Sequence, residues 1–126
     1  MAYTLMIVDD SNIIRNRIER IFQSSNIEIV AHANNGVEAL NKFKELKPNL
    51  VTMDLTMPQM DGLECIKQIV AESSDVSILV VSALADKETA LHALQYGARG
   101  FICKPFTEEE LHNALNRLIT LNKMNK

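Results

Sequence analysis

Five short apolar runs alternate with five amphipathic patterns along this chain, and no other feature constrains its fold as strongly. The runs are Leu5–Val8, Ile27–Ala33, Leu50–Asp54, Val76–Ser82 and Gly100–Lys104. After each run, apolar residues recur every three or four positions, which is the spacing of one helix face. Several runs are apolar on both faces, as expected for strands of a parallel sheet that helices cover on both sides. The sequence therefore predicts an α/β fold, a doubly wound parallel sheet of five strands with five helices.

The expected helices carry boundary signals. For the first helix, the pattern predicts a buried face of Ile13, Ile14, Ile18, Ile21 and Phe22 and an exposed face of Arg15, Asn16, Glu19 and Arg20. Pro48 ends the second pattern, and Gly97 follows the fourth, where a C-cap glycine is favoured. N-caps are expected at Asp61 with Glu64 at N3, at Asp86, and at Thr107 with Glu110.

The length and charge of the chain exclude several classes of protein. Its 126 residues suffice for one domain, expected to span 1–126, with a core that needs no disulfide. The net charge of −3 and the dispersed Lys and Arg residues argue against a nucleic-acid surface, which needs clustered basic side chains. No apolar stretch approaches the roughly 20 residues that span a bilayer. Cys65 and Cys103 form no CxxC motif, so we expect buried, reduced thiols in a cytoplasmic protein.

Polar residues gather where the predicted strands end. The first strand is followed by Asp9 and Asp10, and the later strands end at Asp54, Ser82 and Lys104. Ligands of open parallel sheets bind beyond the carboxyl ends of the strands, so these side chains are expected to share one edge. Two carboxylates about 4 Å apart repel each other by about 4 kcal/mol at an effective dielectric constant near 20. A fold that gathers them there implies a cation.

A hard divalent metal and a phosphoryl group account for this set of side chains. Mg²⁺ prefers oxygen ligands and is commonly held by one or two carboxylates together with phosphate oxygens. Lys104 and Ser82 would add a positive charge and a hydroxyl, which suits phosphoryl transfer. Asp54 can then act as the nucleophile and form an aspartyl phosphate. Each residue taken singly could be a helix cap, a turn residue, a buried hydroxyl or a surface lysine, but their shared edge favours the site.

Four motifs, in this order, resemble those of a known family. They are Val8-Asp9-Asp10-Ser11, the stretch from Met53 to Gly62, Val81-Ser82-Ala83, and Lys104-Pro105-Phe106. Over nearly its whole length the chain resembles response-regulator receiver domains, in particular the stand-alone CheY-like type. The resemblance implies the flavodoxin-like strand order 2-1-3-4-5 and a cis peptide bond between Lys104 and Pro105.

The resemblance also implies a role for each residue of the site. Asp54 is the expected phosphoacceptor. Asp10, Asp54 and the backbone carbonyl of Thr56 would bind Mg²⁺ (or Mn²⁺), and Asp9 would act largely through a bound water. Ser82 and Lys104 would contact the phosphoryl group. The expected switch and partner face consists of Phe101, Lys87, Leu91, Gln95 and Tyr96. Apolar Leu84 is expected to lengthen the phosphorylated lifetime.

The implied function is that of a two-component response regulator, a signalling module rather than an enzyme with a separate substrate. A CheA-like histidine kinase would be the phosphodonor. The phosphorylated chain, a monomer with no effector domain, would bind a flagellar motor switch protein in chemotaxis. Alternatively, the chain is a phosphorelay intermediate that passes its phosphoryl group to a histidine phosphotransfer protein.

Two alternatives come from other classes of protein. An acid-metal phosphatase of the haloacid dehalogenase type would carry a second Asp two residues after the nucleophile, where this chain has Thr56. A flavodoxin-like cofactor binder would need a phosphate-binding loop where Asp9 and Asp10 stand, and their carboxylates would repel phosphate. Both alternatives are disfavoured.

Overall fold

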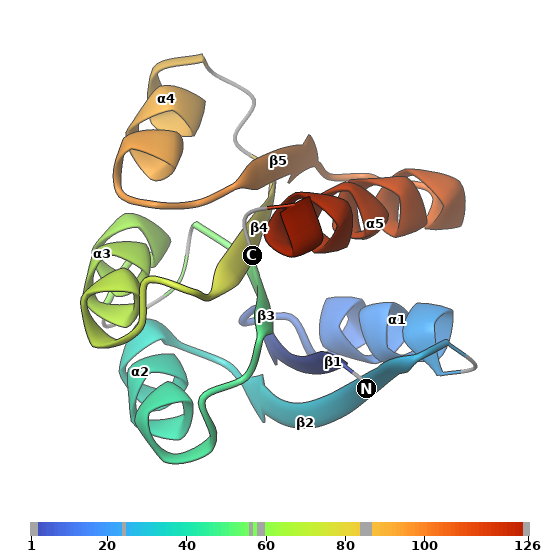
Figure 1. The fold of residues 1–126 in the computed structure, drawn as a ribbon, viewed down its shortest axis with the longest axis horizontal. Helices are drawn as coiled ribbons and strands as arrows, with labels where there is room; N and C mark the ends of the chain where they lie inside the picture. The colour runs from blue at the N-terminus through green and yellow to red at the C-terminus, as the bar shows by residue number, and fades with distance from the viewer. Residues whose placement is uncertain (1–2, 24, 56, 58–59, 84–86, 125–126) are drawn as a thin grey trace.

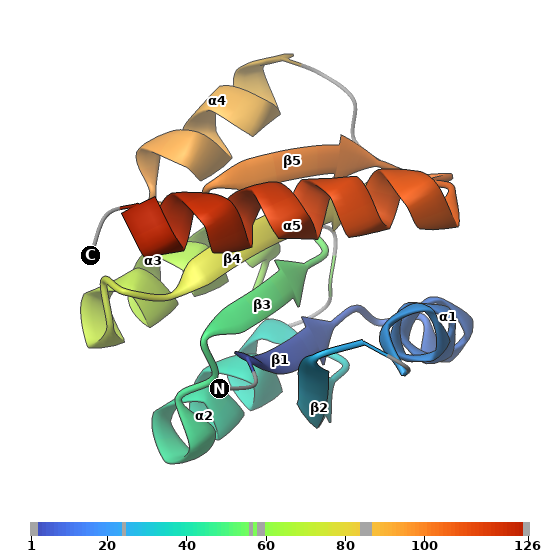
Figure 2. The same cartoon turned by 45° about the vertical axis from the view of Figure 1, so that its right-hand side comes forward.

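The computed structural model describes residues 3–23, 25–55, 57, 60–83 and 87–124, with side chains described except at 87 and 121–124. Five parallel strands form one sheet in the order β2-β1-β3-β4-β5, which confirms the predicted fold and strand order. Neighbouring strands pair in parallel throughout the sheet, and Figure 2 shows the arrowheads of β1, β3 and β5 pointing the same way. The strands are β1 (Tyr3–Val8), β2 (Ile27–Ala33), β3 (Leu50–Met53), β4 (Ser77–Ser82) and β5 (Gly100–Cys103).

Helices cover both faces of the sheet. They are α1 (Asn12–Phe22), α2 (Gly36–Leu46), α3 (Gly62–Glu72), α4 (Lys87–Gln95) and α5 (Glu108–Met124). Figure 1 shows α1 and α5 on one side of the sheet and α2, α3 and α4 on the other. None of the helices in the described part of the chain has the length and apolar character needed to cross a membrane.

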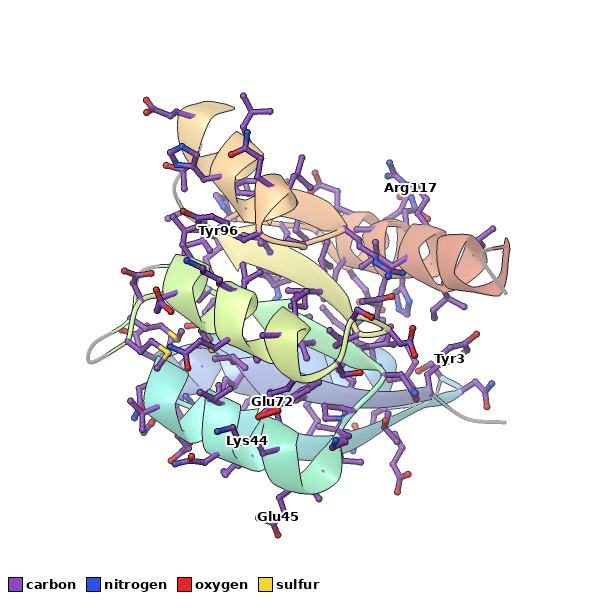
Figure 3. The ribbon with its side chains drawn as sticks, turned by 60° about the vertical axis from the view of Figure 1, so that its left-hand side comes forward. Tyr3, Lys44, Glu45, Glu72, Tyr96 and Arg117 are labelled. Atoms are coloured by element: carbon purple, nitrogen blue, oxygen red, sulfur yellow. The ribbon has the colours of Figure 1, made fainter. Side chains whose placement is uncertain are left out.

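Alternate side chains of each strand point to opposite faces of the sheet, so the core has two layers. Leu5, Ile7, Leu50 and Leu79 pack with buried residues of α1 and α5 such as Phe22 and Leu115. Met6, Val8, Val51 and Val80 pack on the other side with residues of α2 and α3 such as Phe43 and Ile66. Successive residues of a strand point to opposite faces, so a strand buried between two helix layers must be apolar throughout. An ion pair between Lys44 and Glu72 joins the C-terminal ends of α2 and α3; both side chains are labelled in Figure 3.

Most of the predicted helix boundaries are confirmed. The Asp61 side chain accepts a hydrogen bond from the Glu64 N–H (2.9 Å) at the start of α3. Thr107 and Glu110 exchange reciprocal side chain to backbone bonds of 2.8 and 3.0 Å, which is a capping box. Gly97 adopts a positive φ of 121° after α4. The predicted cap Asp86, and Leu84, lie outside the described residues.

Several details differ from the sequence prediction. Asp54 and Lys104 stand just beyond their strands, and β4 begins at Ser77, one residue after the predicted Val76. The helix α2 stops ahead of Pro48, as predicted, with its C-cap Lys47 in a left-handed conformation. Ile13 is 78% exposed, because it lies about 100° around α1 from Ile14 and so outside the stripe that meets the core.

The remaining two corrections concern Arg15 and Cys103. Arg15, expected on the exposed face of α1, is half-buried, because its long side chain turns back toward the sheet edge and contacts Asp9. Both cysteines are free thiols, but Cys103 is exposed, because it ends the edge strand β5.

Candidate functional site

Three carboxylates meet at the carboxyl edge of the central strands. Asp9 follows β1 and Asp54 follows β3, two strands that pair in register from Leu5 with Leu50 to Val8 with Met53. The Asp54 N–H donates to the Val8 carbonyl (3.0 Å), which extends the pairing by one residue and brings the two aspartates together. One oxygen from each of Asp9, Asp10 and Asp54 lies within 4.8 Å of the others. The structure therefore brings together the three aspartates that the sequence placed at one edge of the sheet.

Burial raises the free-energy cost of keeping the carboxylates of this cluster ionised. Asp9 and Asp54 are only 1% and 2% exposed, whereas Asp10 is exposed. Charges removed from water interact more strongly and cost more to keep ionised without a partner. Among the described residues, Lys104 supplies a counter-charge through its ammonium.

Lys104 reaches the cluster from the end of the edge strand β5, across the position of β4 in the sheet. Its Nζ lies 2.7 Å from Asp9 Oδ2 and 3.7 Å from Asp54 Oδ2. The Lys104 N–H donates to the Ser82 carbonyl (2.9 Å), which places the lysine directly after the last pair of the β4–β5 ladder. Three carboxylates and one ammonium leave a formal charge of −2 at the site. Such a charge, presented by oxygen ligands, matches a hard dication.

Of the other predicted site residues, the structure describes Ser82 but not Thr56. Ser82 ends β4 and is fully buried, one strand away from Asp54. The bond between Lys104 and Pro105 is cis, as the resemblance implied. Thr56 lies outside the described residues.

Two residues near Asp9 were not predicted as part of the site. The Ser11 N–H donates to Asp9 Oδ1 (2.8 Å), and the Ser11 hydroxyl caps α1 by accepting from the Ile14 N–H. Arg15 Nη1 donates to the Asp9 carbonyl (2.5 Å). The contact of Ser11 could have been predicted, because a serine between a strand and a helix is typical of a cap. The helical pattern gives no sign that Arg15 contacts Asp9.

Two glycines allow the chain to approach closely near the site. A Cβ on Gly62 would lie 2.4 Å from the Asp54 carbonyl, and one on Gly36 would lie 2.3 Å from the Met60 carbonyl. Cys65 lies beneath them, and its thiol donates to the Gly36 carbonyl. Burial, with smaller contributions from Asp61 and Glu64, raises the pKa of the Cys65 thiol to about 12. The Cys65 thiol is therefore protonated at neutral pH and is not a reactive thiolate.

The comparisons with known proteins decide the family. A family model described as the response regulator receiver domain matches residues 5–116. The chain belongs to the response regulator receiver family. As a receiver domain it is a signalling module of two-component systems.

Individual proteins that are similar to this receiver domain support the same family assignment. The chemotaxis protein CheY of Listeria monocytogenes is 42% identical over 113 residues, covering 90% of this chain and 95% of the relative. CheY of Bacillus subtilis is 41% identical over 122 residues, covering 97% and 100%. Among solved structures, a chain of the CheX–CheY–BeF3–Mg²⁺ complex of Borrelia burgdorferi matches with a TM-score of 0.87 and 31% identity, over 94% of this chain and 88% of that one.

The predicted partner face of the receiver domain lies on α4 and β5. Leu91 and Tyr96 are 57% and 39% exposed, and Gln95 is also exposed. Tyr96 stacks on His92 and lies under the ammonium of Lys67 (5.8 Å), so it is held between α4 and α3. Phe101 is half-buried and packs against the core on the α2–α4 side. The Lys87 side chain lies outside the described residues.

Proposed function

We propose that this receiver domain takes a phosphoryl group from a phosphohistidine of a partner kinase onto Asp54, with Mg²⁺ (or Mn²⁺) bound beside it. One observation carries the proposal: three carboxylates, two of them buried, converge with a lysine at the edge where the central strands end. A buried acidic cluster of this kind is stabilised by a bound cation and suits an incoming phosphoryl group.

The contacts of the Asp9 carboxylate indicate its role toward the metal. Both oxygens of Asp9 are engaged, one by the Ser11 N–H and the other by Lys104. Asp9 therefore suits an indirect role through water. By the resemblance to receiver domains, Asp10, Asp54 and the Thr56 carbonyl would hold the metal directly. When bound, the metal neutralises charge on the phosphoryl oxygens and orients them for transfer.

The transfer itself uses the chain's own side chains. A carboxylate oxygen of Asp54 forms a bond to phosphorus while the bond between phosphorus and the imidazole nitrogen breaks, and its electron pair returns to the imidazole. Lys104 turns from Asp9 toward the phosphoryl oxygens, since its Nζ is already 3.7 Å from Asp54 Oδ2. The Ser82 hydroxyl donates to another of these oxygens.

Phosphorylation then changes the partner face. Ser82 and Phe101 lie on the paired strands β4 and β5, with Val80 opposite Phe101 in the register. Movement of Ser82 toward the phosphoryl group leaves space, and half-buried Phe101 turns inward to fill it. This biases an existing two-state equilibrium and reshapes the surface that contains Leu91, Gln95, Tyr96 and, by the resemblance, Lys87.

The downstream process we propose is chemotaxis, with a CheA-like kinase as donor, a flagellar motor switch protein as target, and a cytoplasmic monomer as the acting form. The support is that relatives about 40% identical over most of the chain are named chemotaxis proteins. The alternative is a phosphorelay step in which the phosphoryl group passes to a histidine phosphotransfer protein.

A capture experiment separates these two roles. The receiver domain is phosphorylated by a ³²P-labelled kinase domain and presented to immobilised motor switch protein or to a histidine phosphotransfer protein, with Asp54→Asn as control. The chemotaxis role predicts retention on the switch protein that requires phosphorylation, with the label remaining on the receiver domain. Movement of the label to the phosphotransfer protein, without retention on the switch protein, would favour the relay.

A further inference from the structure

Arg17 joins α1 to the loop that carries Lys104. Its Nη2 donates to the Phe106 carbonyl (2.7 Å), and its guanidinium carbon lies 4.6 Å from the centre of the Phe106 ring. In the part of the chain that the structure describes, Arg17 forms no ion pair with a carboxylate. Its charged group is therefore committed to this loop, by one hydrogen bond and one cation–π contact.

The loop has few other anchors. The ladder between β4 and β5 ends with the Lys104 N–H, Pro105 has no N–H to donate, and the next described backbone anchor is the capping box at Thr107. Phe106 is 4% exposed and packs with residues of α1 and α5. Lys104 thus lies between two fixed points, the Ser82 carbonyl before it and the Phe106 carbonyl after it.

We propose that Arg17 is a positioning residue for Lys104. By holding the Phe106 carbonyl and ring, it fixes the backbone from which the lysine reaches Asp9 and Asp54. The inference rests on the proposed function, in which Lys104 contacts the phosphoryl group. Among the described residues, Arg17 has no hydrogen bond or ion pair to Asp9, Asp10 or Asp54.

The test compares Arg17→Met with Arg20→Met in the whole chain. Methionine keeps an apolar stem without donors, and exposed Arg20 on the same helix controls for the loss of one positive charge. For Arg17→Met we expect phosphorylation by acetyl phosphate at saturating Mg²⁺ to be about 10- to 100-fold slower, the range typical of a misplaced group. The Mg²⁺ affinity, measured by calorimetry, is expected to change less than about twofold in Arg20→Met. In Arg17→Met it should tighten, by no more than loss of the Lys104 ammonium itself would produce, because a displaced ammonium competes less with the cation.

A second comparison asks whether Arg17 acts through Lys104. In a Lys104→Met background, adding Arg17→Met is expected to slow phosphorylation by less than about twofold, because the group that it positions is already gone. Arg17→Lys, which keeps the charge and a donor, is expected to recover part of the rate. An unchanged rate for Arg17→Met, or an equal slowing in the Lys104→Met background, would overturn the proposal. Urea unfolding of each variant shows that it is folded under assay conditions.

A third readout does not depend on phosphorylation. Relaxation of the Lys104 ammonium nitrogen by NMR, without phosphodonor, is expected to show a lower order parameter in Arg17→Met than in Arg20→Met. If wild type and Asp54→Asn gain phosphate equally, the proposed function fails, yet this measurement still tests Arg17. An unchanged order parameter would contradict the positioning role.

Discussion

Replacing Lys104 with methionine tests the electrostatics of the site most sharply. The substitution keeps the apolar stem but removes the ammonium that faces Asp9 and Asp54. Those two carboxylates are 2% exposed and the lysine side chain is 19% exposed, so water cannot fully take over the role of the ammonium. The variant therefore leaves a buried acidic cluster without its counter-charge from the protein.

The distances set the size of the effect. At an effective dielectric constant near 20, the attraction of the ammonium is about 6 kcal/mol for Asp9 at 2.7 Å and about 4.5 kcal/mol for Asp54 at 3.7 Å. Much of this gross attraction offsets the cost of desolvating the three groups. Removing one partner of a buried pair costs about 3–5 kcal/mol, and the partial exposure of Lys104 favours the lower end, about 3 kcal/mol.

The same substitution has the opposite effect on metal binding. In the wild type, a dication entering the cluster competes with the ammonium for the negative charge. Without that competitor, we expect Mg²⁺ to bind about tenfold more tightly, which is about 1.4 kcal/mol. Saturating Mg²⁺ should therefore restore more stability to Lys104→Met than it adds to the wild type.

Urea unfolding followed by circular dichroism, with and without Mg²⁺, measures both effects. Lys44→Met is the matched control, because Lys44 forms an exposed ion pair with Glu72 and its loss should cost less than about 1 kcal/mol. The reasoning is refuted if Lys104→Met is as stable as Lys44→Met in the absence of metal and gains no more from Mg²⁺ than the wild type does.

Three further predictions concern the surroundings of the site. Thr52→Val should raise the free energy of unfolding by about 1 kcal/mol in urea titrations, because the buried Thr52 hydroxyl has no hydrogen-bond partner among the described residues; a loss of stability would contradict this. Gly62→Ala should cost about 1–3 kcal/mol in the same assay and slow phosphorylation, because the new Cβ would press on the Asp54 carbonyl; wild-type values for both would be inconsistent with the close approach. At pH 8, Ellman's reagent should modify exposed Cys103 quickly and Cys65 only on unfolding, because the pKa of Cys65 near 12 keeps its thiol protonated; two fast thiols would show that Cys65 is not sequestered.

The sequence predicted the arrangement of the strands and the edge where the site lies. The apolar runs had to be buried on both faces, and in a parallel sheet their ends had to lie together. Asp54 and Lys104 are the last residues of two of those runs, so their meeting could be anticipated without coordinates.

Other features depend on the direction of long side chains, which a periodic pattern does not specify. Arg15 and Arg17 are polar positions of an amphipathic helix, and nothing in their spacing shows that one contacts the Asp9 carbonyl and the other Phe106. Ile13 is exposed because the buried stripe of a helix is narrower than its run of apolar residues. Cys103 is exposed because the strand that it ends lies at the edge of the sheet, a property of strand order rather than of local sequence.

Mass spectrometry of the intact protein after incubation with acetyl phosphate tests the central claim most directly. Wild type and Asp54→Asn are compared, each with Mg²⁺ and with the metal removed by chelation. We predict one added phosphoryl group on the wild type, present only with metal, and none on Asp54→Asn. A phosphoryl group that persists on Asp54→Asn, or that forms equally well without metal, would contradict the assignment of Asp54 and of the acidic cluster around it.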